Sequence, residues 1–210
     1  MKNRPILLET IFVTAITLLG MWFLPAAKTL FALIPIAYLL IERRVRKRTW
    51  SDLGFKRSTF WADLQANWVL FVLLGFVIQP ATALFARAYF PAFLTHVQAR
   101  LPFEDGMSWG MLLPLLAISL LGEEMTYRTL IQGRLAPFVG VPAAIGIASL
   151  LFGLAHFAPG PAFIIAADIG LIVFDSILYG MIFARRNNLW VVWLAHLLGD
   201  IFGLLVLSLV

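Results

Sequence analysis

The chain has 210 residues, of which 61% are hydrophobic and 13% charged, and its mean hydropathy is +0.92. Soluble domains are nearer half apolar and about a quarter charged, so the composition predicts a protein that crosses the membrane several times. The net charge of +5 fits membrane orientation and lipid headgroup contact better than nucleic-acid binding, since the basic run ERRVRKR (42–48) has no interleaved aromatic residues. Cysteine is absent, which excludes disulfides, thiolate metal sites and a cysteine nucleophile.

Apolar segments follow one another along the chain and predict membrane helices. They fall near 6–25, 29–41, 64–86, 108–121 with an extension to about 136, 141–158, 162–184 and 189–210. A spanning helix needs roughly 20 residues, or fewer where the bilayer thins. The sequence therefore predicts an all-α, polytopic membrane protein of about seven transmembrane helices, within a range of six to eight.

Two connecting stretches carry their own signals. The stretch WSDLGFKRSTFW (50–61) is amphipathic and aromatic, so we expect it at the membrane interface. The segment 88–107 contains FPAF and RLPFEDG, which are expected to break any helix. The chain shows no repeat, no low-complexity tract and no soluble domain, and residues 1–210 are predicted to form one integral membrane domain.

The basic residues predict the orientation, because positive charges concentrate on the cytoplasmic side. With the N-terminus inside, twelve of the 16 basic residues lie on the inner side, three on the outer side and Arg128 within the membrane. The inner set is Lys2, Arg4, Arg43, Arg44, Arg46, Lys47, Arg48, Lys56, Arg57, Arg134, Arg185 and Arg186. The outer set is Lys28, Arg87 and Arg100. We therefore expect a multi-pass protein of the cell membrane, plasma or inner, with a cytoplasmic N-terminus.

Ionisable side chains within the predicted spans are the candidates for function, because each costs several kcal/mol and needs a partner or a role. They are Glu9, Glu123, Glu124, Arg128, His156, Asp168, Asp175, His196 and Asp200. Glu9 is expected to be inward and paired. Asp168 and Asp175 are seven apart and share a helix face, where they could line a cavity or pair helices. Gly199-x-x-x-Gly203 allows another helix to approach closely.

The segment GEEMTYR (122–128) ends an apolar run and carries two glutamates and an arginine. Glu124 and Arg128 are one helical turn apart and can pair, whereas Glu123 points about 100° away around the axis. A desolvated carboxylate beside another binds a proton more readily, which suits a general base. The alternative is an ion pair that only holds two helices together.

Two histidines complete the set. Phe152 and His156, in FGLAH, share a helix face, as do His196 and Asp200, in HLLGD. Each histidine taken alone is explained by packing or a local hydrogen bond. Glutamate, histidine and aspartate side chains gathered in an apolar protein, however, are what the activation of a water molecule requires, with or without a metal. The chain has no HExxH, G-x-S-x-G, P-loop or G-x-G-x-x-G motif.

These motifs resemble those of the CPBP family of intramembrane proteases, also called the CAAX protease and bacteriocin-processing, or ABI, family. The family motifs EExxxR, FxxxH and HxxxN/D follow in this order on successive membrane helices, and here they read EEMTYR (123–128), FGLAH (152–156) and HLLGD (196–200). The resemblance covers roughly 108–205, which would be the catalytic core, while 1–107 would supply further spans and loops. It implies a CAAX-protease-like helical bundle that hydrolyses peptide bonds inside the bilayer, in eukaryotic members by removing a C-terminal tripeptide from prenylated proteins.

The resemblance also implies roles for the motif residues. Glu123 would be the base that activates water, supported by Glu124 and Arg128. His156 would bind or polarise that water, or a metal.

The third motif would steady the oxyanion through His196 and Asp200. The best-known eukaryotic members have asparagine where this chain has Asp200, and a carboxylate is a poor oxyanion donor unless protonated, so Asp200 could instead bind metal or hold His196. A zinc ion on His156, His196 and Glu123 and a metal-free, glutamate-activated water both remain expectations.

Two functions of other classes compete with the protease. A non-catalytic membrane scaffold or bacteriocin self-immunity protein could use the same polar cluster for packing or partner binding. An ion-coupled transporter would predict two related halves, and the sequence shows no such repeat. The expected partners are the lipid bilayer and a membrane-embedded or lipidated protein or peptide substrate, with no nucleic acid. The oligomeric state and the identity of the substrate stay open.

Overall fold

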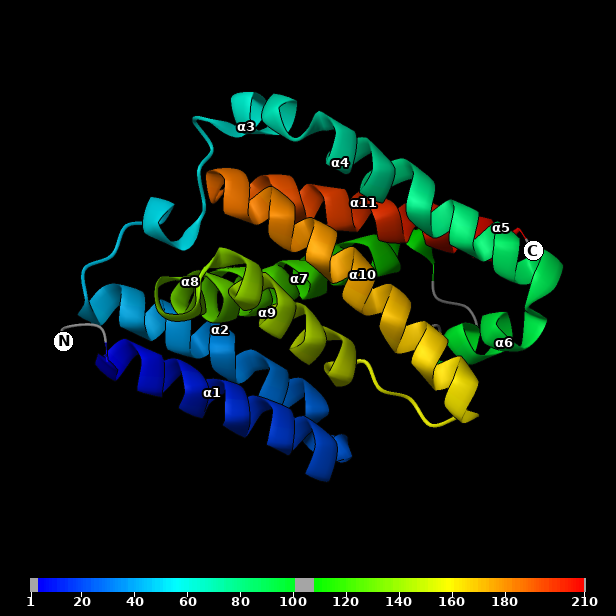
Figure 1. Ribbon diagram of the computed structural model, residues 1–210, viewed down its shortest axis with the longest axis horizontal. Helices are drawn as coiled ribbons and strands as arrows, with labels where there is room; N and C mark the ends of the chain where they lie inside the picture. Colours follow the sequence, from blue (N-terminus) through cyan, green and yellow to red (C-terminus); the bar gives the residue numbers. More distant parts are fainter. Residues whose placement is uncertain (1–3, 101–107, 210) are drawn as a thin grey trace.

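The computed structural model describes residues 4–100 and 108–209, and every regular element in these ranges is a helix (Figure 1). The predicted all-α class is confirmed. Lys2 and most of the RLPFEDG motif (100–106) lie outside the described residues. The division into N-terminal spans (1–107) and a catalytic core (108–205) stays a prediction.

The helices follow the predicted apolar segments closely. In the first half they are α1 (Arg4–Phe23), η1 (Pro25–Ala27), α2 (Lys28–Val45), η2 (Ser51–Leu53), α3 (Phe60–Ala66), α4 (Trp68–Val72), η3 (Leu73–Ile78), α5 (Gln79–Tyr89) and α6 (Pro91–Arg100). In the second half they are α7 (Trp109–Glu124), η4 (Met125–Gln132), α8 (Gly133–Val139), α9 (Val141–Ala155), α10 (Ala162–Arg186) and α11 (Leu189–Ser208). The turns η1 and η2 are 3₁₀ helices, whereas η3 and η4 are π-helical.

Local chemistry sets several of these boundaries. Gly140 has φ +83° between α8 and α9, a backbone conformation that favours glycine. Asn187 ends α10 in the left-handed region. Asn188 then caps α11, because its side-chain oxygen accepts a hydrogen bond from the N–H of Trp190 at 3.1 Å.

Five helical stretches are long and apolar enough to cross a membrane: Arg4–Phe23, Pro25–Val45, Trp68–Tyr89, Ala162–Arg186 and Leu189–Ser208. The segment 29–41, short in sequence, thus belongs to a longer helix. The remaining two predicted spans correspond to α9, which is shorter, and to the run from α7 through η4 to α8, whose α7 part has 16 residues. The chain is a polytopic helical membrane protein, and the count of seven spans stays a prediction.

The expectation that segment 88–107 is non-helical is wrong for its first part. Helix α5 ends at Tyr89, as the FPAF sequence suggests, but α6 begins immediately at Pro91 and continues to Arg100. Proline is favoured in the first turn of a helix, where its missing N–H has no partner to lose. Pro91 therefore separates two helices and starts the second.

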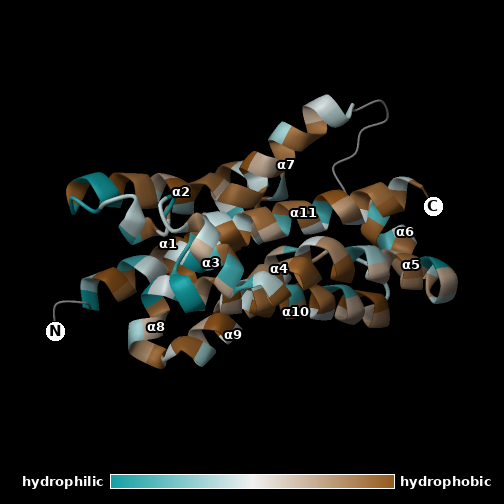
Figure 2. Cartoon of the chain, turned by 90° about the horizontal axis from the view of Figure 1, so that it is seen from above, coloured by the Kyte–Doolittle hydropathy of each residue, from teal (hydrophilic) through white to brown (hydrophobic). Residues whose placement is uncertain are grey.

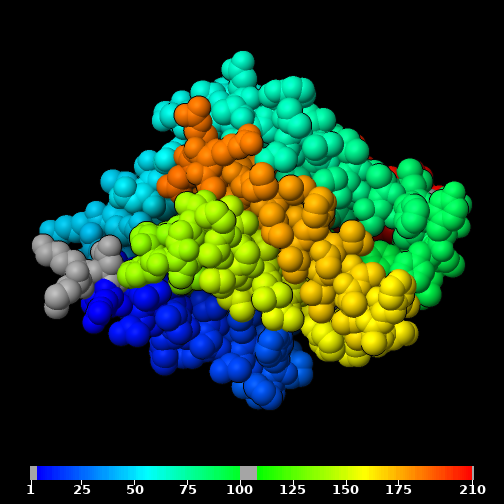
Figure 3. Space-filling model, in the orientation of Figure 1, coloured from blue at the N-terminus to red at the C-terminus, as the bar shows by residue number. Residues whose placement is uncertain are grey.

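The last three long helices pack against their neighbours: α10 contacts α9, and α11 contacts η3 and α5. Figure 3 shows α9 and α10 crossing the visible face between α1 and the segment from α3 to α5. A Cβ added at Gly199 would come within 2.7 Å of the Leu74 carbonyl oxygen, and one at Gly203 within 3.1 Å of Gln79 Cβ. The close helix approach predicted for Gly199 and Gly203 is confirmed.

The start of α1 and the end of α11 lie at opposite ends of the long axis (Figure 1). Hydrophilic residues gather where α1 begins and α2 ends (Figure 2). Here Glu9 accepts hydrogen bonds from Tyr38 and Arg46, so its predicted pairing is confirmed. Arg134 joins α8 to this end through a 2.8 Å contact with Glu42. Which end faces the cytoplasm stays a prediction.

Candidate functional site

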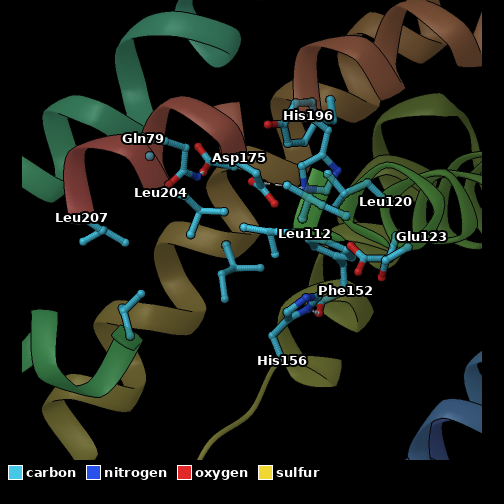
Figure 4. A pocket seen from close by; sticks show the side chains of 17 residues that line it. Gln79, Leu112, Leu120, Glu123, Phe152, His156, Asp175, His196, Leu204 and Leu207 are labelled. Carbon is cyan, nitrogen blue, oxygen red and sulfur yellow. Dashed lines mark hydrogen bonds and ion pairs between the residues drawn. The ribbon is translucent and has the colours of Figure 1, made fainter. Parts of the chain in front are cut away.

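The three motifs meet at one cavity of about 290 Å³. Glu123 reaches it from the end of α7, His156 from just after α9 and His196 from α11 (Figure 4). Asp200 of α11 lines the same cavity. Most of its wall is apolar, with Leu112, Leu116, Leu120, Val97, Ile172, Leu204 and Leu207 among the lining residues. The structure therefore brings together residues from the three motifs although 77 positions separate Glu123 from Asp200 in the chain.

The two adjacent glutamates face different surroundings. Glu123 is half-buried and lines the cavity, whereas Glu124 is 1% exposed and does not line it. Glu124 Oε2 accepts a hydrogen bond from Arg128 Nε at 3.0 Å, so the predicted pair one turn apart is confirmed. The divergence follows from the helix itself, because neighbouring side chains point about 100° apart.

Among the residues that the structure describes, Arg128 is the largest fully buried side chain, with 0% of its surface exposed. Besides Glu124 it reaches α10, where its Nη2 donates to Ser176 Oγ at 2.8 Å. It lies in the π-helix η4, a rare conformation that often occurs at functional sites. Arg128 therefore lies behind the cavity and neutralises the buried carboxylate of Glu124.

The Glu124 carboxylate has a second partner on α11. His196 is 6% exposed, and its Nδ1 lies 2.8 Å from Glu124 Oε1. A carboxylate already paired with Arg128 can only accept here, so the shared proton lies on Nδ1 and the opposite ring nitrogen, Nε2, faces Asp200 Oδ1 at 3.9 Å. Glu124 thus fixes both the orientation and the tautomer of His196.

His156 is oriented by its own helix end. Its Nδ1 donates to the Phe152 carbonyl oxygen at 2.8 Å, and the two rings are 4.5 Å apart between centroids. The predicted common face of Phe152 and His156 is therefore confirmed. Phe152 also lies edge-on to His196, with centroids 6.0 Å apart, so this ring packs between the two histidines.

Two lining residues, Gln79 and Tyr179, were not predicted from the sequence, whereas Asp175 lines the cavity, as one of the two alternatives given for it has it. Asp175 on α10 is 7% exposed and accepts a 2.6 Å hydrogen bond from Gln79 of α5. Tyr179, one turn further along α10, is 1% exposed and stacks on His196 at 4.6 Å between centroids. An inventory of every polar side chain in the spans, uncharged ones included, would have found Gln79 and Tyr179.

The second aspartate of α10 lies away from the motif residues. Asp168 Oδ2 is 3.4 Å from His96 Nε2 of α6, and both side chains are largely buried. Asp168 and Asp175 both line a smaller cavity that shares Gln79 and Ile172 with the main one. The predicted common face of the two aspartates is confirmed.

The predicted metal ligands Glu123, His156 and His196 all line the cavity, but the side chains do not form a ready metal site. Within residues 4–100 and 108–209, no three His, Cys, Asp or Glu side chains converge on a point where they could hold an ion. A catalytic zinc site takes three protein ligands in a tetrahedral arrangement. The donor set, as this structure arranges it, does not fit a zinc ion.

Comparison with known proteins agrees with the motifs. Residues 105–202 match the model of a protein family described as "Type II CAAX prenyl endopeptidase Rce1-like". This range includes all three motifs and every residue predicted for the site, so the resemblance seen in the sequence is confirmed over it. No curated protein and no solved structure matches the chain.

Proposed function

Because residues 105–202 match the model of the Rce1-like family of type II CAAX prenyl endopeptidases, we propose that this multi-pass membrane protein is an endopeptidase that cleaves within the bilayer. One observation carries the proposal: Glu123, His156 and His196 face a single cavity between apolar helices. Most of the cavity wall is apolar, which suits a membrane-embedded or lipidated protein or peptide as substrate. The cytoplasmic position of the N-terminus is part of the same proposal.

In the proposed reaction Glu123 takes a proton from a water molecule that His156 helps to hold. The oxygen of that water adds to the carbonyl carbon of the scissile bond, and the electron pair of the C=O bond moves to its oxygen. The tetrahedral intermediate then collapses and breaks the C–N bond, while Glu123 returns the proton to the leaving nitrogen. The products are a new carboxyl end and a new amino end.

The neighbouring motif residues act as positioning groups in this scheme. Arg128 and Glu124 are fully buried and paired, and Glu124 holds His196 against the cavity through the 2.8 Å contact with its Nδ1. Because the His196 ring also stacks on Tyr179 of α10, turning it would break this stacking and leave the buried Glu124 Oε1 without its donor. Glu123 takes no part in these contacts and can therefore exchange a proton with the water molecule in the cavity.

The proposal is tested by comparing protein termini in membranes that contain either the wild type or Glu123→Gln at equal abundance. Glutamine keeps the shape of the side chain but cannot take a proton, so new termini are expected with the wild type only. These termini would also identify the cleaved bond and its client. Identical termini in both membranes, with both proteins folded, would favour the scaffold or immunity protein.

Removal of metal ions is expected to leave the cleavage rate unchanged, because the side chains of the cavity do not converge as a ligand set. The measurement is cleavage by the purified protein after treatment with 1,10-phenanthroline, with a well-characterised zinc protease treated in parallel as the control. Loss of activity that added zinc restores would show that the ligands rearrange around a metal.

A further inference from the structure

A separate groove lies at the surface, where α3 meets the start of α11. It is lined by Arg57, Phe60, Trp61, Trp190, Trp193 and Leu194. The volume of this tryptophan groove is about 440 Å³, and roughly 300–1,000 Å³ is typical of sites that hold small molecules. The groove shares no lining residue with the cavity of the three motifs, so it is a feature of its own.

The contacts around the tryptophan groove place it at the membrane surface. Residues 187–188 connect α10 and α11, and both helices are long and apolar enough to cross a membrane, so this connection lies outside the hydrocarbon core. The segment before α3 is bonded to the connection. The Leu189 N–H donates to the Gly54 carbonyl oxygen at 2.7 Å, and the Asn188 side chain donates to that of Lys56 at 2.9 Å. Helix α3 lies beside the start of α11 (Figure 1), and the groove between them is therefore at the level of the lipid headgroups.

The groove has a cation without a counter-ion. Arg57 is exposed, and its guanidinium carbon lies 5.8 Å from the centre of the Trp190 ring. Within residues 4–100 and 108–209 it forms no ion pair. Other basic residues lie at the same end of α10, where Lys56 Nζ donates to the Arg186 carbonyl oxygen at 3.0 Å and Arg185 Nη1 to a carbonyl oxygen at the end of α3 at 3.4 Å. A negatively charged group would therefore be attracted to this place.

The acidic residues of the same segment are already engaged. Asp63 of α3 is 6% exposed, and its carboxylate accepts hydrogen bonds from Thr59 at 2.6 Å and from Asn188 at 2.8 Å. The carboxylate of Asp52 accepts a hydrogen bond from the Thr49 N–H at 2.7 Å. Neither aspartate lines the groove, so the charge of Arg57 is available to a molecule that enters it.

Aromatic rings form the walls of the groove. Phe60 and Trp61 of α3 meet edge to face with 5.1 Å between centroids, as do Trp190 and Trp193 of α11 at 5.7 Å. Trp193 is fixed in place, because its Nε1 donates to the Ala117 carbonyl oxygen of α7 at 2.8 Å. Trp61 is 77% exposed. Tryptophan is favoured at the level of the headgroups, where one side of the ring meets polar groups and the other meets acyl chains.

We propose that the tryptophan groove binds one anionic phospholipid, with the phosphate at Arg57 and the upper part of the acyl chains against the tryptophan rings. Guanidinium groups donate paired hydrogen bonds to phosphate oxygens, and basic pockets beside membrane helices bind acidic headgroups. The exposed rings favour a lipid over free phosphate, because they offer apolar surface that only the acyl chains can cover. Binding here is independent of the proposed proteolytic function.

The test measures lipid binding to the purified protein in detergent by native mass spectrometry. Phosphatidylglycerol and phosphatidylcholine with the same acyl chains are titrated in parallel, since both carry the phosphate and only the first has a net charge. The wild type is expected to bind one phosphatidylglycerol, and to bind it more tightly than phosphatidylcholine. Arg57→Gln is expected to weaken the binding of phosphatidylglycerol about fivefold, the loss expected for one basic residue near a membrane surface.

Arg44→Gln is the matched control for the charge, because Arg44 is also an exposed arginine but lies at the end of α2 and outside the groove. Trp61→Ala removes part of the apolar wall and keeps the charge, and Trp68→Ala removes an exposed tryptophan that does not line the groove. We expect Trp61→Ala to weaken binding, and Arg44→Gln and Trp68→Ala to bind phosphatidylglycerol as the wild type does.

Three results would overturn the proposal. Equal losses in Arg57→Gln and Arg44→Gln would show a general charge effect without a site. Equal affinities of the wild type for the two lipids would remove the preference for an anionic headgroup. A dimer in the same spectra that Arg57→Gln abolishes would assign the groove to a second copy of the chain. Because cleavage is not measured, each of these results leaves the proposed proteolytic function untouched.

Discussion

Replacing Glu124 by alanine is expected to remove most of the folded protein. Arg128 is 0% exposed and Glu124 1% exposed, and their 3.0 Å contact lies inside the helix bundle. Removing one member of a buried ion pair leaves the other charge uncompensated, which typically costs about 3–5 kcal/mol of the free energy of unfolding. The same change takes away the acceptor of His196 Nδ1, so a second buried polar group loses its partner.

The adjacent residue provides the control for this experiment. Glu123→Ala removes the same chemical group one position earlier, from a half-buried side chain that faces the cavity. We expect this variant to unfold at the wild-type temperature in detergent and to have no proteolytic activity. Equal melting temperatures for Glu123→Ala and Glu124→Ala would contradict the division between a cavity-facing and a structural glutamate.

Replacing Gly199 by alanine is expected to lower stability and activity together. The added methyl group would lie 2.7 Å from the Leu74 carbonyl oxygen and 3.3 Å from the Tyr179 hydroxyl, and the first of these atoms belongs to the backbone of η3. Overpacking of this kind typically costs about 1–3 kcal/mol, because helices must move to make room. Helix α11 carries His196 and Asp200, so its displacement also moves two lining residues of the cavity.

Gly146 is the matched control for Gly199, because it also lies within a helix but a Cβ there meets nothing within 4 Å. Gly146→Ala is expected to be neutral or slightly stabilising, since alanine is preferred over glycine in helices by roughly 0.5–1 kcal/mol. Thermal unfolding and peptide cleavage measured on both variants test the pair. A Gly199→Ala protein that matches Gly146→Ala in both measurements would show that η3 and α11 can separate freely.

Several features of the fold follow from local properties of the sequence alone. Long apolar runs predict helices, because a backbone inside a bilayer must satisfy its own hydrogen bonds. The pairing of Glu124 with Arg128 and the common face of Phe152 and His156 also follow from the sequence, since residues four apart on a helix are neighbours. Each of these features depends on atoms within one or two helical turns.

The segment after α5 shows the limit of such local signals. FPAF was expected to prevent a helix, yet α6 begins at Pro91 within it. A proline can end one helix or start the next, so the residues around it determine whether a helix follows. In the structure α6 contacts both α5 and α10, and Phe93 of α6 is 6% exposed. The helix α6 therefore forms where it packs against two other helices.

The contacts that build the cavity depend on the tertiary structure. His196 meets Glu124 across 72 positions of the chain, Arg128 meets Ser176 across 48, and Gln79 meets Asp175 across 96. Helical periodicity places side chains on faces, but which faces meet depends on how the helices pack. The motifs thus named Glu123, His156, His196 and Asp200, which the structure places at one cavity, while the stacking of Tyr179 on His196 became visible only when α10 and α11 were placed side by side.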